Sequence, residues 1–193
     1  MAEPGSSLAI EENVALAPFT SIGVGGPARF LARARSEEHI LQSLLFAEKR
    51  GCPVFVLGGG SNILISDSGF PGLVVKVELG GIRAAADGRV SAAAGEDLDT
   101  LIRLCIDKNL AGLECLSGIP GTVGAAPVQN IGAYGQELGE RLVGIDFLDY
   151  ATGELVRLDA SELGLGYRTS TLKRGRLGVV LAIELDLDAG GWS

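Results

Sequence analysis

Residues 118–137 read GIPGTVGAAPVQNIGAYGQE, a segment with five glycines, two prolines and almost no charge. Glycine lets the backbone approach a ligand closely and adopt angles that a Cβ atom forbids, and proline restricts the chain, so we expect a bent and fairly rigid segment. This composition is unusual for a strand or a helix. It favours a site built from backbone groups that holds a large, flat cofactor.

A second glycine cluster, GGGSN, follows an apolar run further upstream. A Rossmann phosphate loop has a helix directly behind its glycines, whereas ILISDSGFPGLVV (63–75) is typical of strand and turn. We therefore predict an anion nest of backbone N–H groups, to which a serine and an asparagine add side-chain hydrogen bonds. The predicted nest consists of Gly58, Gly59, Gly60, Ser61 and Asn62. A tight turn that binds no ligand is the alternative. Two glycine segments in one small chain indicate a ligand with two polar parts, such as a dinucleotide.

Length and charge narrow the class of protein. The chain has 193 residues, enough for one large domain or two small ones, and 47% of them are hydrophobic. No apolar run approaches the roughly 18 residues of a membrane span, and the start lacks the features of a secretory signal, so we predict a cytoplasmic protein without a membrane partner. Its 16 Lys and Arg against 24 Asp and Glu give a net charge of −8, which argues against nucleic acid as a partner.

Cysteine and histidine usage argues against several chemistries. Cys52, Cys105 and Cys115 form no CxxC pair and are odd in number, which indicates buried, reduced thiols and neither a disulfide framework nor a metal site. The single histidine, His39, lies near the start of a predicted helix and is expected on the surface. We therefore predict no metal and no histidine-based catalysis.

Apolar periodicity predicts a βαβ-like unit followed by a strand-rich region. Strands at 28–34 and 53–57 flank a helix capped by Ser36 and stopped by Gly51. Its predicted apolar stripe is Ile40, Leu41, Leu44, Leu45 and Ala47. The further predicted elements are strands at 63–66 and 73–79, a hairpin at 82–95 around Asp87-Gly88, a helix at 97–109, a hairpin at 142–159 and a strand at 178–188.

Four segments occur in a fixed order: NVALAPFTSIGVGGPA (13–28), GGGSN (58–62), SGIPGTVGAAPVQNIGAYGQE (117–137) and GYRTS (166–170). Together they resemble the UDP-N-acetylenolpyruvoylglucosamine reductase family of peptidoglycan precursor synthesis, over about residues 13–187. The triple-glycine turn alone is weakly specific. The long glycine-rich motif followed by Tyr-Arg is highly specific.

The resemblance implies an α+β chain with the vanillyl-alcohol-oxidase-like (PCMH-type) FAD-binding fold, in which two α/β lobes hold FAD between them. The expected divisions are a flexible leader at 1–12, a small lobe at 13–78, a larger lobe at 79–188 and a tail at 189–193. It also implies NADPH as co-substrate. Hydride passes from NADPH to FAD and then to UDP-N-acetylglucosamine enolpyruvate, a nucleotide-sugar substrate, giving UDP-N-acetylmuramate.

The resemblance assigns roles to residues of both glycine segments and of GYRTS. The turn at 58–62 is expected to hold the FAD pyrophosphate. The residues expected to line the flavin and its ribityl chain are Ile119, Pro120, Gly121, Gly124, Ala125, Val128 and Gly132. Tyr167 is expected to help bind substrate. Arg168 is expected to lie against the substrate carboxylate and to stabilise the negative charge that develops as hydride arrives.

The chain also departs from the family pattern. Family members continue into a substrate-binding domain with a serine proton donor and a glutamate, and neither motif is present here. The resemblance therefore implies the FAD-binding portion of a C-terminally truncated member, inactive by itself. Two alternatives remain: an FAD-linked oxidase, for whose flavin tether His39 is poorly suited, and a non-catalytic flavin-binding remnant.

Overall fold

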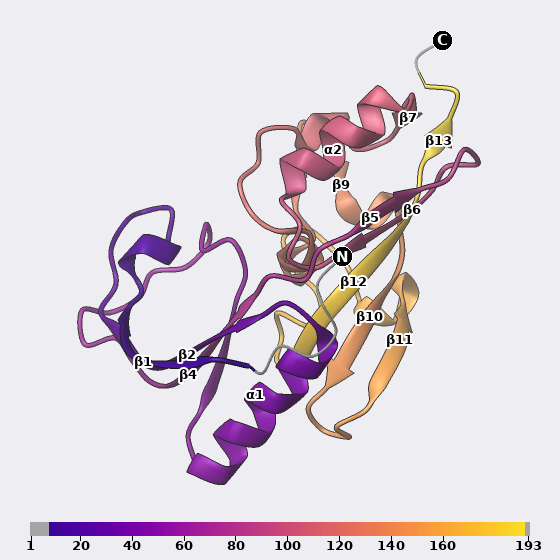
Figure 1. Ribbon diagram of the computed structural model, residues 1–193. Helices are drawn as coiled ribbons and strands as arrows, with labels where there is room; N and C mark the ends of the chain where they lie inside the picture. Colours follow the sequence, from indigo (N-terminus) through magenta and orange to yellow (C-terminus); the bar gives the residue numbers. More distant parts are fainter. Residues whose placement is uncertain (1–7, 192–193) are drawn as a thin grey trace. The chain divides into compact units, whose positions relative to one another are not determined.

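Two units make up the chain in the computed structural model, which describes residues 8–191 (Figure 1). The N-terminal unit is Met1–Leu79 and the C-terminal unit is Gly80–Ser193. Each unit has its own main sheet, and each carries one of the two glycine segments. The architecture is mixed α/β.

The N-terminal unit is a four-stranded sheet with one helix beside it (Figure 1). Its strands are β1 (Ile10–Ala15), β2 (Pro27–Ala34), β3 (Val54–Leu57) and β4 (Phe70–Val77), and its helices are α1 (Glu37–Arg50) and a 3-10 helix, η1 (Ala17–Phe19). The strand order is β1-β2-β4-β3, with β4 parallel to both β2 and β3. The predicted β2-α1-β3 unit is confirmed, with β4 inserted between its two strands.

The first helix begins and ends where its capping residues predict. The Ser36 side chain accepts the His39 N–H at 3.2 Å, and Gly51 ends the helix in the left-handed region at φ 58°. The predicted stripe is partly wrong, because Leu45 is 53% exposed and Ser43 is buried instead. Ser43 tolerates burial because its hydroxyl donates to the His39 carbonyl at 2.7 Å.

The strand predicted at 63–66 does not form. The alternation of its side chains is present, since Ile63 and Ile65 pack on the core while Leu64 is exposed. Its backbone, however, bonds to a loop, with Gly26 N–H donating to Ser66 O at 2.9 Å. A short apolar alternation therefore does not establish a ladder without a neighbouring strand. The core that it covers consists of Leu16, Ala28, Leu31, Leu57 and Val74.

Both ends of the described chain are more ordered than the sequence predicted. Ile10, Glu11 and Glu12 pair with β2 as the start of β1, so the expected leader at 1–12 is wrong for these residues. At the other end, Ala189 belongs to a short strand that pairs with Leu110. Residues 1–7 and 192–193 lie outside the described residues.

The C-terminal unit is built on a five-stranded antiparallel sheet of order β11-β10-β12-β6-β5. These strands are β5 (Ile82–Ala84), β6 (Arg89–Ala93), β10 (Leu142–Asp149), β11 (Leu155–Asp159) and β12 (Gly178–Asp186). Both predicted hairpins and the predicted last strand are thereby confirmed. The smaller elements are β7 (Leu110–Ala111), β8 (Gly132–Ala133), β9 (Gln136–Glu137), β13 (Asp188–Ala189), and the 3-10 helices η2 (Glu114–Leu116), η3 (Val123–Ala125), η4 (Pro127–Gln129), η5 (Leu138–Glu140) and η6 (Ala160–Leu163).

The second helix, α2 (Leu98–Asp107), buries the face that its sequence predicts. That face consists of Leu98, Leu101, Ile102 and Cys105. Burial, with a smaller contribution from the Glu114 carboxylate, raises the pKa of the Cys105 thiol to about 11. The three cysteines are unpaired, but only Cys105 is buried, so the prediction of buried thiols is wrong for Cys52 and Cys115.

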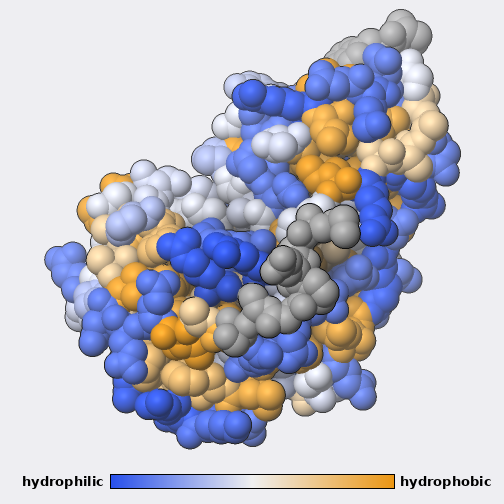
Figure 2. All heavy atoms as spheres, in the orientation of Figure 1, coloured by the Kyte–Doolittle hydropathy of each residue, from blue (hydrophilic) through white to orange (hydrophobic). Residues whose placement is uncertain are grey.

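Apolar surface is distributed in patches. Figure 2 shows hydrophobic residues in separate groups among hydrophilic ones on the face in view.

Within residues 8–191, no helix combines the length and the apolar character that crossing a membrane requires.

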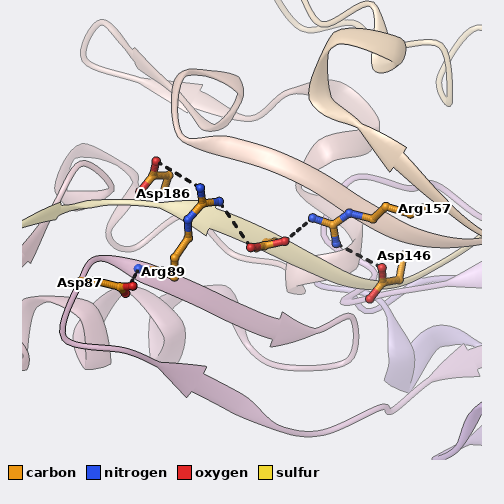
Figure 3. Close-up of polar contacts among 6 residues, drawn as sticks. Asp87, Arg89, Asp146, Arg157 and Asp186 are labelled. Carbon is orange, nitrogen blue, oxygen red and sulfur yellow. Dashed lines mark hydrogen bonds and ion pairs between the residues drawn. The ribbon is translucent and has the colours of Figure 1, made fainter.

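A row of charges crosses the exposed face of the five-stranded sheet (Figure 3). Arg89 of β6 and Arg157 of β11 both bind the Glu184 carboxylate of β12, and Arg157 also binds Asp146 at 3.1 Å. The Arg157 side chain crosses β10 at Gly144 to reach β12. A Cβ atom on Gly144 would lie 3.1 Å from the Arg157 Nε atom. These ion pairs therefore connect side chains of four neighbouring strands, β11, β10, β12 and β6.

We predict that Glu184→Gln lowers the free energy of unfolding by about 1 kcal/mol, because it leaves two guanidinium groups without their shared carboxylate. Urea unfolding followed by circular dichroism measures this change. Glu154→Gln, on an exposed turn of the same unit, removes the same charge and serves as the control. The difference between the two variants should shrink in 1 M salt, and equal stability of the two at low salt contradicts the prediction.

Candidate functional sites

The glycine cluster of the N-terminal unit lies at the carboxyl end of a parallel strand. Gly58 directly follows β3, whose last residue, Leu57, is in register with Lys76 of β4. In open α/β sheets, ligands bind beyond the carboxyl ends of parallel strands. No helix follows the cluster up to β4, so the structure agrees with the exclusion of a Rossmann loop.

Close packing requires a glycine at position 60. It is buried, its φ is 68°, and a Cβ atom on it would lie 1.9 Å from the Phe19 carbonyl oxygen. The turn therefore packs backbone against backbone on η1, which no other residue type allows. A left-handed residue within a turn is also a component of backbone anion nests.

Two carbonyl groups of this turn are held by donors from elsewhere in the unit. Ser21 N–H donates to Gly60 O at 3.0 Å, and the Lys76 ammonium donates to Gly58 O. In a planar trans peptide the C=O and N–H groups point in opposite directions. The N–H groups of Gly59 and Ser61 therefore point away from Lys76 and Ser21, respectively. An anion nest needs N–H groups that are directed toward the ligand and away from such internal donors.

Lys76 was not recognised as a site residue in the sequence. It is half-buried, and burial lowers the pKa of its ammonium, an effect that the Glu78 carboxylate opposes. The available signal was that Lys76 is the one charged residue of β4, whose sequence is FPGLVVKV.

The glycine-rich segment of the C-terminal unit lies against the entry to α2. Val123 N–H donates to Glu96 O and Gly124 N–H to Ala94 O, both at 2.9 Å. A Cβ atom on Gly124 would lie 2.5 Å from that of Ala94. The absence of a side chain at Gly124 thus serves packing against residues 94–96, and its N–H group is already used.

The residues expected to line a flavin remain accessible along this segment. Pro120 and Ala125 are exposed, whereas Ile119, Gly121, Gly124, Val128 and Gly132 are half-buried. The buried members of the same segment are Val123, Ala126, Pro127, Asn130 and Ile131. The segment therefore has one side in the core and another that a ligand can reach.

Asp99 holds the start of this segment. Its carboxylate accepts the Gly118 N–H at 2.8 Å, the Ser117 hydroxyl at 3.1 Å and the Arg103 guanidinium at 2.6 Å. The hydrogen bond from Gly118 is the largest cause of a lowered pKa at Asp99, ahead of Ser117 and Arg103. The segment is thus fixed to the first turn of α2.

Tyr167 and Arg168 lie at the tip of a tight turn. Gly166 and Thr169 close it through two reciprocal backbone hydrogen bonds of 3.1 Å each. Tyr167 is 84% exposed, and Arg168 has a left-handed φ of 53°, uncommon for a residue with a side chain. The Arg168 guanidinium donates to Gly132 O at 2.7 Å. The structure therefore brings Arg168 to the glycine-rich segment, 36 residues earlier in the chain.

Asn130 and Ser170 hold this turn in place, and sequence reasoning missed both. Asn130 is buried, with φ 44°, and its amide donates to Gly166 O at 3.1 Å and to the Glu137 carboxylate at 2.7 Å. Ser170 donates to Val128 O at 2.5 Å. A polar residue among small apolar ones was the signal at Asn130. Its partners, distant in sequence, were not readable.

Comparison with known proteins identifies the family of the chain. A family model described as an FAD binding domain matches residues 28–159. UDP-N-acetylenolpyruvoylglucosamine reductase of Nocardia farcinica is 47% identical to this chain, and the match covers 98% of this chain and 49% of the relative. The reductase of Leifsonia xyli is 46% identical, and the match covers 90% of this chain and 47% of the relative. The chain thus spans about half the length of the curated relatives it matches.

Solved structures give the same result for the fold. The crystal structure of the Thermus caldophilus UDP-N-acetylenolpyruvylglucosamine reductase matches with a TM-score of 0.80 and 32% identity, over 95% of this chain and 64% of that one. Alkyldihydroxyacetonephosphate synthase shares the fold alone. It matches with a TM-score of 0.60 and 14% identity, over 84% of this chain and 32% of that one. The predicted PCMH-type FAD-binding fold is confirmed. The chain belongs to the FAD-binding domain family and is a homologue of the UDP-N-acetylenolpyruvoylglucosamine reductases.

Proposed function

We propose that the chain binds one FAD molecule, with its pyrophosphate at Gly58–Asn62 and its flavin along the segment from Ile119 to Gly132. The observation that carries the proposal is the orientation of the N-terminal turn, in which Lys76 holds the Gly58 carbonyl and Gly59 N–H points away from that donor. The accessible side of the glycine-rich segment supports the proposed position of the flavin. The residues at the two places fit an anionic, flat ligand, since the turn at 58–62 consists of small residues with peptide groups and the segment at 119–132 consists mainly of small, uncharged residues.

We further propose that the whole protein is an NADPH-dependent reductase that converts UDP-N-acetylglucosamine enolpyruvate to UDP-N-acetylmuramate in peptidoglycan synthesis. Support comes from the names of the relatives and from the Arg168 turn. Bound FAD supplies hydride transfer between the two substrates. The chain's own residues then have to place the substrate and stabilise the charge that develops on it.

Arg168 suits the second of these tasks. One of its N–H groups donates to Gly132 O, which holds the guanidinium beside the glycine-rich segment, while the residue itself stays exposed. A fixed guanidinium presents its other donors in a rigid fork that matches a carboxylate and stabilises negative charge on the adjoining carbon framework. The exposed Tyr167 phenol is proposed to contact the same substrate. The Lys173 ammonium, which donates to Arg168 O at 2.9 Å, supports the left-handed backbone at this position.

The flavin proposal has a direct test. The purified chain is mixed with FAD, and binding is followed by calorimetry and by the absorption bands of the flavin. Saturable binding of one FAD per chain is expected. Absence of binding overturns the proposal. NADPH oxidation is then measured with and without the enolpyruvyl substrate. Turnover that depends on this substrate distinguishes a reductase from a flavin-binding protein without catalysis. A covalently attached flavin in the mass spectrum would instead favour an oxidase.

We predict that Gly59→Asp weakens FAD binding by about tenfold or more, because its carboxylate repels the pyrophosphate. Calorimetric titration measures the dissociation constant. Ala86→Asp is the control, since it adds the same charge at an exposed turn residue whose φ is not left-handed. An unchanged FAD affinity in Gly59→Asp counts against the nest.

We predict that Arg168→Ala slows reduction of the enolpyruvyl substrate by about 100-fold but leaves flavin reduction by NADPH nearly unchanged. The two half-reactions are separated by stopped-flow absorbance, in this chain or in a version extended to the length of its relatives, whichever turns over substrate. Arg83→Ala, an exposed arginine on β5, is the control. Equal losses in both half-reactions would remove Arg168 from its proposed role.

A further inference from the structure

Lys76 places a positive charge against the glycine turn. Its side chain leaves β4 and donates to Gly58 O, the first carbonyl of the turn. The adjoining peptide plane is thereby fixed, because a rotation that turned Gly59 N–H inward would carry Gly58 O away from the ammonium. Lys76 thus decides which way Gly59 N–H points.

The charge of Lys76 is not neutralised by an ion pair of its own. The nearest carboxylate in sequence, Glu78, binds Arg33 at 3.3 Å and Arg35 at 3.1 Å. None of the ion pairs found among residues 8–191 includes Lys76. In a chain of net charge −8, an anionic ligand has to be met by local positive groups, and a half-buried ammonium is screened less by solvent than an exposed one.

We infer that Lys76 is a positioning residue of the anion-binding turn: its ammonium orients the Gly58–Gly59 peptide toward a diphosphate and adds positive potential behind it. This inference rests on the proposed FAD site and adds to it a residue outside the glycine motif. It predicts a specific dependence on phosphate. Ligands that carry a diphosphate require Lys76, and the flavin ring does not.

The test compares three variants of the full chain. Lys76→Met keeps most of the side-chain length and removes the donor and the charge, Lys76→Arg keeps both, and Lys49→Met removes an exposed charge at the end of α1 in the same unit. Affinities for FAD and for riboflavin, which lacks phosphate, are measured by flavin fluorescence. Lys76→Met should weaken FAD binding about tenfold, as expected for loss of a hydrogen bond from a charged group, and leave riboflavin binding unchanged.

Lys76→Arg and Lys49→Met should retain FAD affinity to within about twofold, a change below the energy of one hydrogen bond. Wild-type affinity for FAD in Lys76→Met overturns the inference. Equal losses for FAD and riboflavin also overturn it, because they indicate a general disturbance of the unit. Thermal unfolding without ligand checks that each variant folds.

A second probe separates this inference from the FAD proposal. Inorganic pyrophosphate should raise the melting temperature of the wild-type chain and of Lys76→Arg, but not that of Lys76→Met. If the wild-type chain responds to pyrophosphate in this way and does not bind FAD, the FAD proposal fails and the role of Lys76 stands. If pyrophosphate stabilises all variants equally, or none of them, the role of Lys76 is refuted whatever the FAD result.

Discussion

Close packing that leaves no room for a Cβ atom is the constraint on which both glycine segments depend. At Gly60 the turn touches the Phe19 carbonyl, and at Gly124 the chain touches Ala94, at distances that a Cβ atom would reduce to 1.9 Å and 2.5 Å, respectively. These glycines are therefore required by packing within each unit before any ligand is considered. The same glycines carry no side chain on the opposite side, which is the side that the proposed FAD site uses.

Polar groups within each unit then fix the direction of those peptide groups. In the N-terminal unit, Ser21 and Lys76 hold two carbonyls of the turn. In the C-terminal unit, Asn130 and Ser170 tie the Tyr167-Arg168 turn to the glycine-rich segment, and Arg168 adds its own bond to Gly132. Left-handed backbone at Asn130 and Arg168 is unfavourable by itself and persists because several hydrogen bonds fix it. The substrate-facing role of Arg168 and the diphosphate-facing role of the turn are proposals built on this preorganisation.

Local signals predicted most elements correctly, and their failures have a common cause. The cap at Ser36, the stop at Gly51 and the Asp87-Gly88 turn act over a few residues, so α1 and the β5-β6 hairpin were readable. The strand at 63–66 and the burial of Leu45 were not, because they depend on what packs beside the segment. Ser66 binds a loop at Gly26, and the buried face of α1 is rotated toward Ser43.

By itself, the sequence determined the FAD-binding family, the βαβ unit, the hairpins and the two glycine segments, since these depend on short motifs and on periodicity along the chain. Only the tertiary structure decided that Lys76 contacts Gly58, that Arg168 contacts Gly132 and that Asn130 joins two segments 36 residues apart. Such contacts join residues whose spacing in the chain carries no periodic or motif signal. They arise when strands and turns pack, because a buried polar group must find its hydrogen-bond partner wherever the fold provides one.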